Sequence, residues 1–263
     1  MGDSRRPFYV IAHNPDSVIQ AEEALLAGAN SLEPDVCFDG RSPDDFNVRD
    51  RWAFKGANFL SKVVYSDPPL SVYLRGLVAF LKSHPENQLA LLAFDLKQPF
   101  NHDINKFFGV IAEEFCPHFP EVSIMTTVGV PRGMKMLVKR KNPGHDEAIG
   151  IDEGISPRRA DRFFKKIGIP YVFGIGTSVP LYPTTVFLRP IDKALQLRDA
   201  GGSFRLVYPW TVNAKSSMKK FLDLKGGVDG IITDNVALLR RLIESEPYNS
   251  RYRLATAADK PFR

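Results

Sequence analysis

Short apolar segments alternate with amphipathic helical segments along nearly the whole sequence, and this alternation limits the fold more than any other feature. The first unit is a buried strand at residues 8–12, a helix that stops at Gly28 and a strand at residues 31–38. Such a unit requires parallel pairing and a right-handed crossover. About eight units follow one another, which favours a (β/α)8 TIM barrel over an open doubly wound sheet.

The other expected elements follow from periodicity and from turn residues. Asn14 is expected to cap the first helix, with Pro15 at its first position. Residues 39–69 are expected to form a loop over the barrel mouth, and residues 134–139 fit either a strand or a helix. Further strands are expected at residues 88–97, 122–127, 147–151, 171–175, 204–210 and 228–233. Further helices are expected at residues 70–83, 102–115, 156–168, 190–200, 215–224 and 236–244.

The bulk properties fit one α/β domain. The chain has 263 residues, and a TIM barrel of about 250 residues is usually a single domain. No apolar run approaches the roughly 18 residues of a membrane span. Residues 1–6 are polar, so we expect no signal peptide in this chain. The protein is then expected to be either cytoplasmic or secreted with its leader removed. The net charge of +5 favours anionic partners, but the basic residues are scattered and form no nucleic-acid motif. We expect a monomer, with two free cysteines.

Two acids lie two residues apart in the apolar segment 32–38. Glu33 and Asp35 share one face of an extended strand, and buried anions this close repel each other unless a cation lies between them. Asp95 closes a second apolar segment at residues 89–94. The pair alone is equally compatible with acids that face water, whereas the third acid favours a site for Mg²⁺, which prefers oxygen ligands.

Other reactive side chains also occur where expected strands end. His13 follows the first strand, Lys97 lies two residues after Asp95, and Trp210 closes a later strand. In a parallel barrel the carboxyl ends of the strands meet at one mouth, where active sites lie. The agreement among separate segments therefore predicts a site at this mouth.

Six motifs in the chain resemble the glycerophosphodiester phosphodiesterase-like barrels, and within them the sphingomyelinase D/phospholipase D toxin branch of spiders and bacteria. They are IAH at 11–13, GANSLEPD at 28–35, FDLK at 94–97, YPWTV at 208–212, GVDGIIT at 227–233 and ATAADKPF at 255–262. The last resembles the closing motif ATxxDNPW of that branch, with Lys260 and Phe262 at the two changed positions. The resemblance spans the chain and implies one TIM-barrel domain over residues 1–263 with a plug-like tail at 255–262.

The resemblance also implies a Mg²⁺-dependent enzyme that processes a phosphodiester. The residues that would hold Mg²⁺ are Glu33, Asp35 and Asp95. His13 would be one of two catalytic histidines, Lys97 would contact the phosphate, and Tyr208 and Trp210 would line the substrate side of the mouth. The substrate would be a lysophospholipid, a sphingolipid or a sugar phosphodiester. In the toxin branch a hydroxyl of the substrate itself attacks, and a cyclic phosphate forms instead of a hydrolysis product.

The chain departs from the family at the second catalytic histidine. No histidine occurs between His13 and His84, and Arg49 stands in the segment FNVRD at 46–50 where that histidine is expected. An arginine, with a pKa above about 12, cannot shuttle a proton. It can hold a phosphate or a sugar through several hydrogen bonds, so Arg49 is interpreted as a substrate-binding residue.

Three functions stay open because of this departure. The enzyme can work with one histidine and recruit Asp50 or Lys97 as the second group. It can instead join sugars through a phosphodiester, as agrocinopine synthases do. The third alternative is a catalytically inactive barrel that only binds phosphodiesters. His102, five residues after Lys97, is the best reserve histidine.

Overall fold

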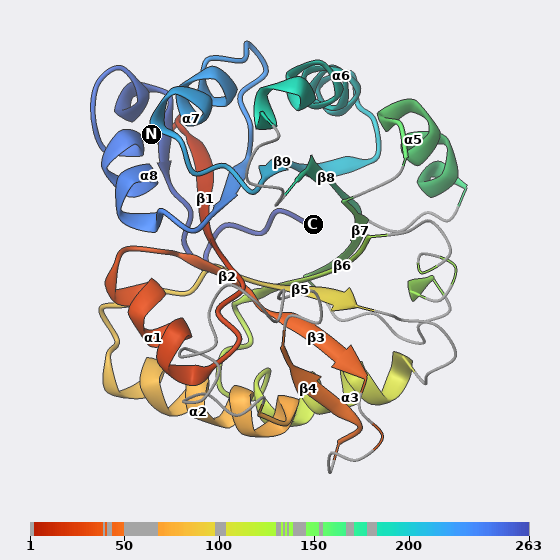
Figure 1. Ribbon diagram of the computed structural model, residues 1–263, viewed down its shortest axis with the longest axis vertical. Helices are drawn as coiled ribbons and strands as arrows, with labels where there is room; N and C mark the ends of the chain where they lie inside the picture. The colour runs from red at the N-terminus through yellow and green to blue at the C-terminus, as the bar shows by residue number, and fades with distance from the viewer. Residues whose placement is uncertain are drawn as a thin grey trace.

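The computed structural model describes residues 3–38, 40, 44–49, 68–97, 104–129, 133, 135, 137–138, 146–152, 155–166, 171–177 and 183–262. Within these ranges a ring of parallel strands is surrounded by helices, as the view in Figure 1 shows. The expected (β/α)8 TIM barrel is confirmed. In the described part of the chain, no helix has both the length and the apolar character needed to cross a membrane.

The barrel strands run in the order β10-β1-β2-β5-β6-β7-β8-β9. Hydrogen bonds from Asp229 N to Val207 O (3.0 Å) and from Val212 N to Ile232 O (2.9 Å) join β9 to β10 and close the ring. The barrel strands and the additional short strands are β1 (Arg6–His13), β2 (Ser31–Glu33), β3 (Asp35–Phe38), β4 (Phe46–Val48), β5 (Leu91–Lys97), β6 (Ser123–Val128), β7 (Glu147–Ile151), β8 (Tyr171–Gly176), β9 (Phe204–Trp210), β10 (Gly230–Thr233) and β11 (Tyr252–Leu254).

Helices cover the outside of this ring in Figure 1. They are α1 (Val18–Leu26), α2 (Leu70–Ser83), α3 (Ile104–Glu114), α5 (Pro157–Lys165), α6 (Leu188–Asp199), α7 (Lys215–Leu222) and α8 (Val236–Ile243), with 3-10 turns η1 (Thr184–Phe187) and η2 (Tyr248–Ser250). The sheet separates two cores, because side chains alternate along each strand. On β1, Phe8 and Val10 belong to the outer core under the helices, whereas Tyr9 and Ile11 belong to the core inside the barrel.

Several local expectations were wrong. Asn14 does not cap α1: Ser17 is the N-cap, and its Oγ accepts a hydrogen bond from Gln20 N at 3.2 Å. Asn14 is instead held by β2, since its N–H donates to Glu33 O at 3.0 Å. The single strand expected at 31–38 is two strands, because Pro34 has no N–H to donate to a neighbouring strand.

The remaining differences lie in connections. β4 lies within the segment expected to be a loop and pairs antiparallel with β3. β11 was not expected and pairs with β1 near the amino end of that strand. Most of the remaining mouth loop, including Asp50, lies outside the described residues. So do His102 and half of residues 134–139. Both cysteines are free, as expected.

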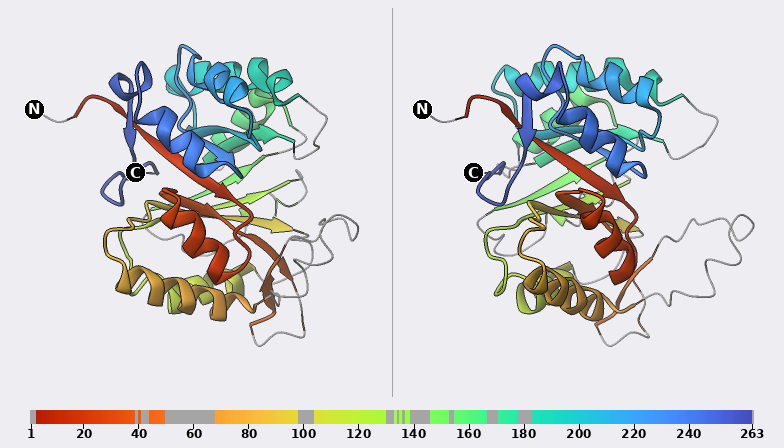
Figure 2. Two further views of the ribbon diagram at one scale, coloured as in Figure 1. Left: turned by 60° about the vertical axis from the view of Figure 1, so that its left-hand side comes forward. Right: turned by 90° about the vertical axis from the view of Figure 1, so that its left-hand side faces the viewer.

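The segment after β11 fills the end of the barrel where the strands begin. It runs to the centre of the ring of strands in Figure 1, and Figure 2 shows both termini at this end of the barrel. Ala255 and Phe262 are buried in the inner core. Asn30 connects this segment to the sheet: its Oδ1 accepts from Val10 N at 2.8 Å, and its Nδ2 donates to Phe8 O at 3.0 Å and to Ala255 O at 2.8 Å.

The buried Asn30 side chain predicts a stability effect. The Asn30→Ala variant leaves the buried N–H of Val10 and the buried carbonyl of Ala255 without the Asn30 side chain as their partner, at a cost of about 1–3 kcal/mol for each unsatisfied group. Phe8 O keeps its hydrogen bond from Ala255 N. We expect urea denaturation to show a loss of about 3 kcal/mol in the free energy of unfolding. Ser216→Ala, on the exposed start of α7, is the control and should change little. A loss below about 0.5 kcal/mol for Asn30→Ala would contradict this role.

Candidate active site

Three carboxylates meet where β2, β3 and β5 adjoin. Glu33 ends β2, Asp35 begins β3, and the register pairs Asp35 with Asp95 of β5. One carboxylate oxygen from each acid lies within 4.8 Å of the others. All three residues are buried, with relative exposures of 5%, 0% and 8%. The structure therefore brings together the three acids that the sequence predicted as metal ligands.

Lys97 is the positive charge of this cluster. Its Nζ lies 3.0 Å from Asp35 Oδ1 and also donates a hydrogen bond to Asp95 Oδ2. Burial alone would lower the pKa of Lys97, but Asp95, Asp35 and Glu33 together raise it, so the ammonium stays charged. One ammonium among three buried acids leaves the cluster short of positive charge.

The shortage of positive charge is seen in the raised pKa values of two of the acids. Burial raises the pKa of Glu33 well above its usual range, and the charges of Asp35 and Asp95 add to this effect. Burial likewise raises the pKa of Asp35, against the attraction of Lys97. Both shifts disfavour the ionised forms, and a bound cation would reverse that preference.

The cluster offers oxygen atoms that have no other partner. Asp35 Oδ1 faces the Lys97 ammonium, whereas Asp35 Oδ2 and Asp95 Oδ1 are buried without a hydrogen-bond partner. Buried polar atoms are normally satisfied, so these oxygens call for a ligand. An all-oxygen donor set of carboxylates suits a hard divalent cation. The residues thus fit a metal ion.

His13 stands beside the acids at the end of β1. Its register partner on β2 is Glu33, and its Nδ1 lies 2.7 Å from Asp234 Oδ1, directly after β10. A neutral imidazole that donates from Nδ1 keeps Nε2 as an acceptor. Burial raises the pKa of Asp234, but the hydrogen bond from His13, the charge of His13 and the hydrogen bond from Asn213 together outweigh burial, and the pKa is lowered. Asp234 therefore stays ionised and orients the imidazole.

Asn213 holds Asp234 in turn. Its Nδ2 donates to Asp234 Oδ2 at 2.5 Å, and its Oδ1 accepts from Asp234 N at 2.9 Å. Sequence reasoning missed both residues. Asp234 directly follows the motif GVDGIIT, and Asn213 follows YPWTV, so their places just after strands were a usable signal.

The two predicted aromatic residues lie at different depths. Tyr208 is buried in the inner core against Gly174, where an added Cβ would come within 2.4 Å of the Tyr208 ring. Trp210 is half-buried at the end of β9, and its Nε1 donates to Asp152 O at 3.0 Å. Trp210 thus lies at the mouth, whereas Tyr208 lies below it, inside the barrel. Their contact with substrate stays a prediction.

Arg49 lies next to the acid cluster. Its N–H donates to Asp35 O at 2.9 Å, and the antiparallel register of β3 and β4 puts the two residues across from each other on one face. Two other histidines in the described ranges, His84 and His118, follow α2 and α3 and thus precede the strands, at the opposite end of the barrel. Among the described residues, His13 is thus the histidine that belongs to the mouth.

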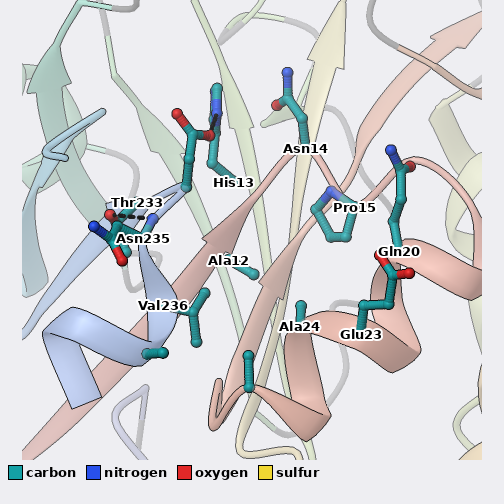
Figure 3. Close-up of a pocket in the computed structure, with 13 residues that line it drawn as sticks. Ala12, His13, Asn14, Pro15, Gln20, Glu23, Ala24, Thr233, Asn235 and Val236 are labelled. Carbon is teal, nitrogen blue, oxygen red and sulfur yellow. Dashed lines mark hydrogen bonds and ion pairs between the residues drawn. The ribbon is translucent and has the colours of Figure 1, made fainter. Parts of the chain in front are cut away.

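A pocket of about 330 Å³ reaches His13 from outside the barrel, between α1 and the start of α8. Figure 3 shows His13 and Asn14 at its upper edge, with Gln20 and Glu23 of α1 on one side and Asn235 on the other. Its walls contain small residues, including Ala24. The pocket gives solvent a route to the His13 side of the site.

A parallel barrel with buried acids, a lysine and an oriented histidine at its mouth has the residues of a TIM-barrel enzyme that uses a metal ion. The family model of dermonecrotic toxin SPH matches residues 3–110 and 121–262. The chain therefore belongs to the dermonecrotic toxin SPH family. It is a phosphodiester-processing enzyme of the sphingomyelinase D and phospholipase D type.

Individual relatives match along nearly their whole length. The dermonecrotic toxin LlSicTox-alphaIII1ii of Loxosceles laeta is 27% identical over 293 residues, which cover 99% of this chain and 98% of the toxin. LruSicTox-alphaIC1d of Loxosceles rufescens is 25% identical over 278 residues, which cover 97% of this chain and 98% of the toxin. The similarity thus includes the whole barrel.

Solved structures share the fold. An Oleispira antarctica phosphodiesterase in complex with the product sn-glycerol-3-phosphate superposes with a TM-score of 0.59 at 13% identity, over 92% of this chain and 98% of that chain. A calcium-dependent phosphoinositol-specific phospholipase C from a Pseudomonas species gives a TM-score of 0.57 at 12% identity, over 90% and 94%. These likenesses concern the barrel architecture.

The raised pKa of Glu33 predicts how the metal-free protein responds to pH. The folded protein binds a proton on the Glu33 carboxylate more tightly than the unfolded chain does. The protonated Glu33 therefore contributes its full stability below the pKa of glutamate in the unfolded chain, about 4.3. This contribution is lost as pH rises toward the pKa of Glu33 in the folded protein. Glu33→Gln removes the acid. In EDTA at neutral pH we expect a higher Tm, by roughly 2–4 °C per kcal/mol gained, and a smaller gain near pH 4.

The matched control for this prediction is Glu86→Gln, an exposed acid after α2. It should leave Tm unchanged at both pH values. A lower Tm for metal-free Glu33→Gln at neutral pH would mean that the cluster stabilises the fold without a cation. Thermal unfolding followed by circular dichroism makes the measurement.

Proposed function

We propose that this protein is a Mg²⁺-dependent enzyme that releases the headgroup of a phosphodiester by intramolecular attack of a substrate hydroxyl. The substrate is a lysophospholipid, a sphingolipid or a sugar phosphodiester. The observation that carries the proposal is the convergence of three buried acids, Lys97 and the His13–Asp234 pair at one barrel mouth. Membership of the dermonecrotic toxin family supports it.

The acid cluster is proposed to bind the phosphate end of the substrate. Glu33, Asp35 and Asp95 hold the metal ion, which, when bound, draws negative charge from the non-bridging phosphate oxygens. Lys97 then has fewer uncompensated acids beside it, and its ammonium supplies a second positive contact to the phosphate. Arg49, across from Asp35, holds the phosphate or an adjoining hydroxyl.

His13 is proposed to act as the general base. Its Nε2 takes the proton of the substrate hydroxyl, the freed oxygen bonds to phosphorus, and the bond from phosphorus to the headgroup oxygen breaks. A cyclic phosphate and a free alcohol result. Arg49 keeps its protons, so the departing oxygen takes a proton from solvent at the mouth. Asp234 stabilises the imidazolium that forms and keeps its ring oriented.

We further propose that the chain acts as a monomeric single domain on such phosphodiesters and not on nucleic acid.

The second candidate function is a synthase that joins two sugars through a phosphodiester. The observation that favours it is Arg49 at the position of the second histidine, because a guanidinium can hold an incoming sugar without transferring its proton. The difference between the two functions is whether the attacking hydroxyl belongs to the same substrate molecule.

The test of this function is ³¹P NMR of the protein with lysophosphatidylcholine, sphingomyelin, glycerophosphocholine and sugar phosphates. With Mg²⁺ we expect a cyclic phosphate from at least one substrate and no product in EDTA. Asp35→Asn should abolish turnover, and His13→Ala should lower it about 10²–10⁴-fold, the usual worth of a general base. Asp45→Asn, whose carboxylate pairs with Lys106 on the surface, is the control.

Each other product has its own meaning in this experiment. A new phosphodiester formed only with an added sugar indicates the synthase. Hydrolysis to a phosphomonoester would disprove intramolecular attack. Binding of Mg²⁺ and substrate without any turnover would overturn the enzymatic proposal in favour of a binding protein.

The proposed role of Arg49 predicts that a positive charge alone at this position is not enough to bind the substrate. Arg49→Lys keeps the charge but loses the planar arrangement of donors, so we expect kcat/KM to fall about tenfold, which corresponds to about 1.4 kcal/mol. Arg205→Lys, on the exposed part of β9, should leave kcat/KM unchanged. An unaltered kcat/KM in Arg49→Lys would show that Arg49 makes no such contact.

A further inference from the structure

Asn14 has an unusual backbone conformation directly beside the acid cluster. Its φ of 48° lies in the left-handed region, which the structure records for one other described non-glycine residue, Asp45. This region is costly for most side chains, and asparagine tolerates it better than others. Strained residues of this kind persist where neighbouring contacts hold them, often at functional sites.

The contacts that hold Asn14 are made with the metal-binding segment. Its N–H donates to Glu33 O at 3.0 Å and lies 3.4 Å from Glu33 Oε2. Two residues later, Asp16 Oδ1 accepts a hydrogen bond from Asp35 N at 2.9 Å. The turn after β1 therefore wraps around the backbone of Glu33 and Asp35, and it fixes Asn14 against a carboxylate of the cluster.

The side chain of Asn14 carries an oxygen that lacks a partner. Its Oδ1 is buried without a hydrogen bond, although the residue as a whole is half-buried. Asp35 Oδ2 and Asp95 Oδ1 of the cluster are buried without a hydrogen-bond partner in the same way. In Figure 3 the Asn14 and His13 side chains extend in the same direction beyond the end of β1. The unsatisfied oxygen thus comes from the strand end that also supplies His13.

We propose that Asn14 Oδ1 is a fourth protein oxygen ligand of the divalent cation at this site. The inference rests on the metal ion of the proposed function and adds one ligand to it. Divalent cations of this type accept side-chain amide oxygens as well as carboxylates. A neutral amide increases the number of ligands without adding a fourth negative charge to a cluster that Lys97 only partly neutralises.

Other roles for this side chain explain less. Asn14 does not cap α1, because Ser17 Oγ accepts the capping hydrogen bond. An acceptor for a substrate hydroxyl would also use Oδ1, but in that case metal affinity would not depend on Asn14. The two roles therefore differ in a quantity that can be measured without substrate.

The experiment measures the affinity of the full chain for Mg²⁺ and for Ca²⁺ by isothermal titration calorimetry, with Tb³⁺ luminescence as a second readout. Asn14→Gly removes the oxygen and fits the left-handed conformation, so the backbone stays unstrained. We expect its Kd for the metal to rise about tenfold or more, while Tm in EDTA stays close to that of the parent. Asn14→Asp restores an oxygen ligand at a residue that tolerates the same φ, and should recover the affinity.

Asp45→Gly is the matched control, since Asp45 also has a positive φ but pairs with Lys106 away from the acids. It should bind metal like the parent protein. Metal affinity of Asn14→Gly within twofold of the parent, or failure of Asn14→Asp to recover it, overturns the proposal. If the parent protein binds the metal but the affinities of the Asn14 variants do not change as expected, the proposed function stands and Asn14 is not a metal ligand. If the parent binds no divalent metal, both are wrong.

Discussion

The repulsion among three buried carboxylates dominates the structure around them. Glu33, Asp35 and Asp95 share a space in which their oxygens lie within 4.8 Å, with Lys97 as the positive charge between them. Such a cluster costs stability in the absence of a cation, because each acid is both desolvated and close to another anion. The parallel hydrogen bonds of β3 and β5 hold the acids at this distance. The sheet therefore supplies the rigidity that an ion-binding site needs.

Barrel closure and assembly of the site are the same event. His13 belongs to β1, and Asp234 follows β10, so the pair joins the first and last strands of the ring. The β1–β10 register, in which Ala12 pairs with Thr233, sets this contact. A chain in which the ring had not closed would have the acids of β2, β3 and β5 but no oriented imidazole. The proposed role of His13 thus depends on the most non-local pair among the strands of the ring.

The sequence allowed the barrel and the acid cluster to be predicted for a physical reason. Parallel strands bring their carboxyl ends to one edge whatever the details of the turns, so Glu33, Asp35 and Asp95 had to converge once the alternation was recognised. The pairing of His13 with Asp234 could not be predicted, because 221 positions separate the two residues and local patterns contain no information about that contact.

Local rules failed where tertiary contacts outweighed them. Asn14 precedes a proline and resembles an N-cap, but the hydrogen bond to Glu33 draws it into the site and leaves Ser17 to cap α1. The strand expected at 31–38 had no visible break except Pro34, whose missing N–H divides β2 from β3. The short strands β4 and β11 have three residues each, too few for periodicity to identify.

The position of Phe262 inside the barrel affects the order in which the protein can fold during synthesis. The ribosome releases β1 early, yet the inner core beside Tyr9 and Ile11 is complete only when Ala255 and Phe262 have left the exit tunnel. Until then the end of the barrel beneath β1 exposes apolar surface to water. Nascent chains therefore have to stay unaggregated until Phe262 has been synthesised, which gives chaperones that bind apolar segments a long interval in which to act.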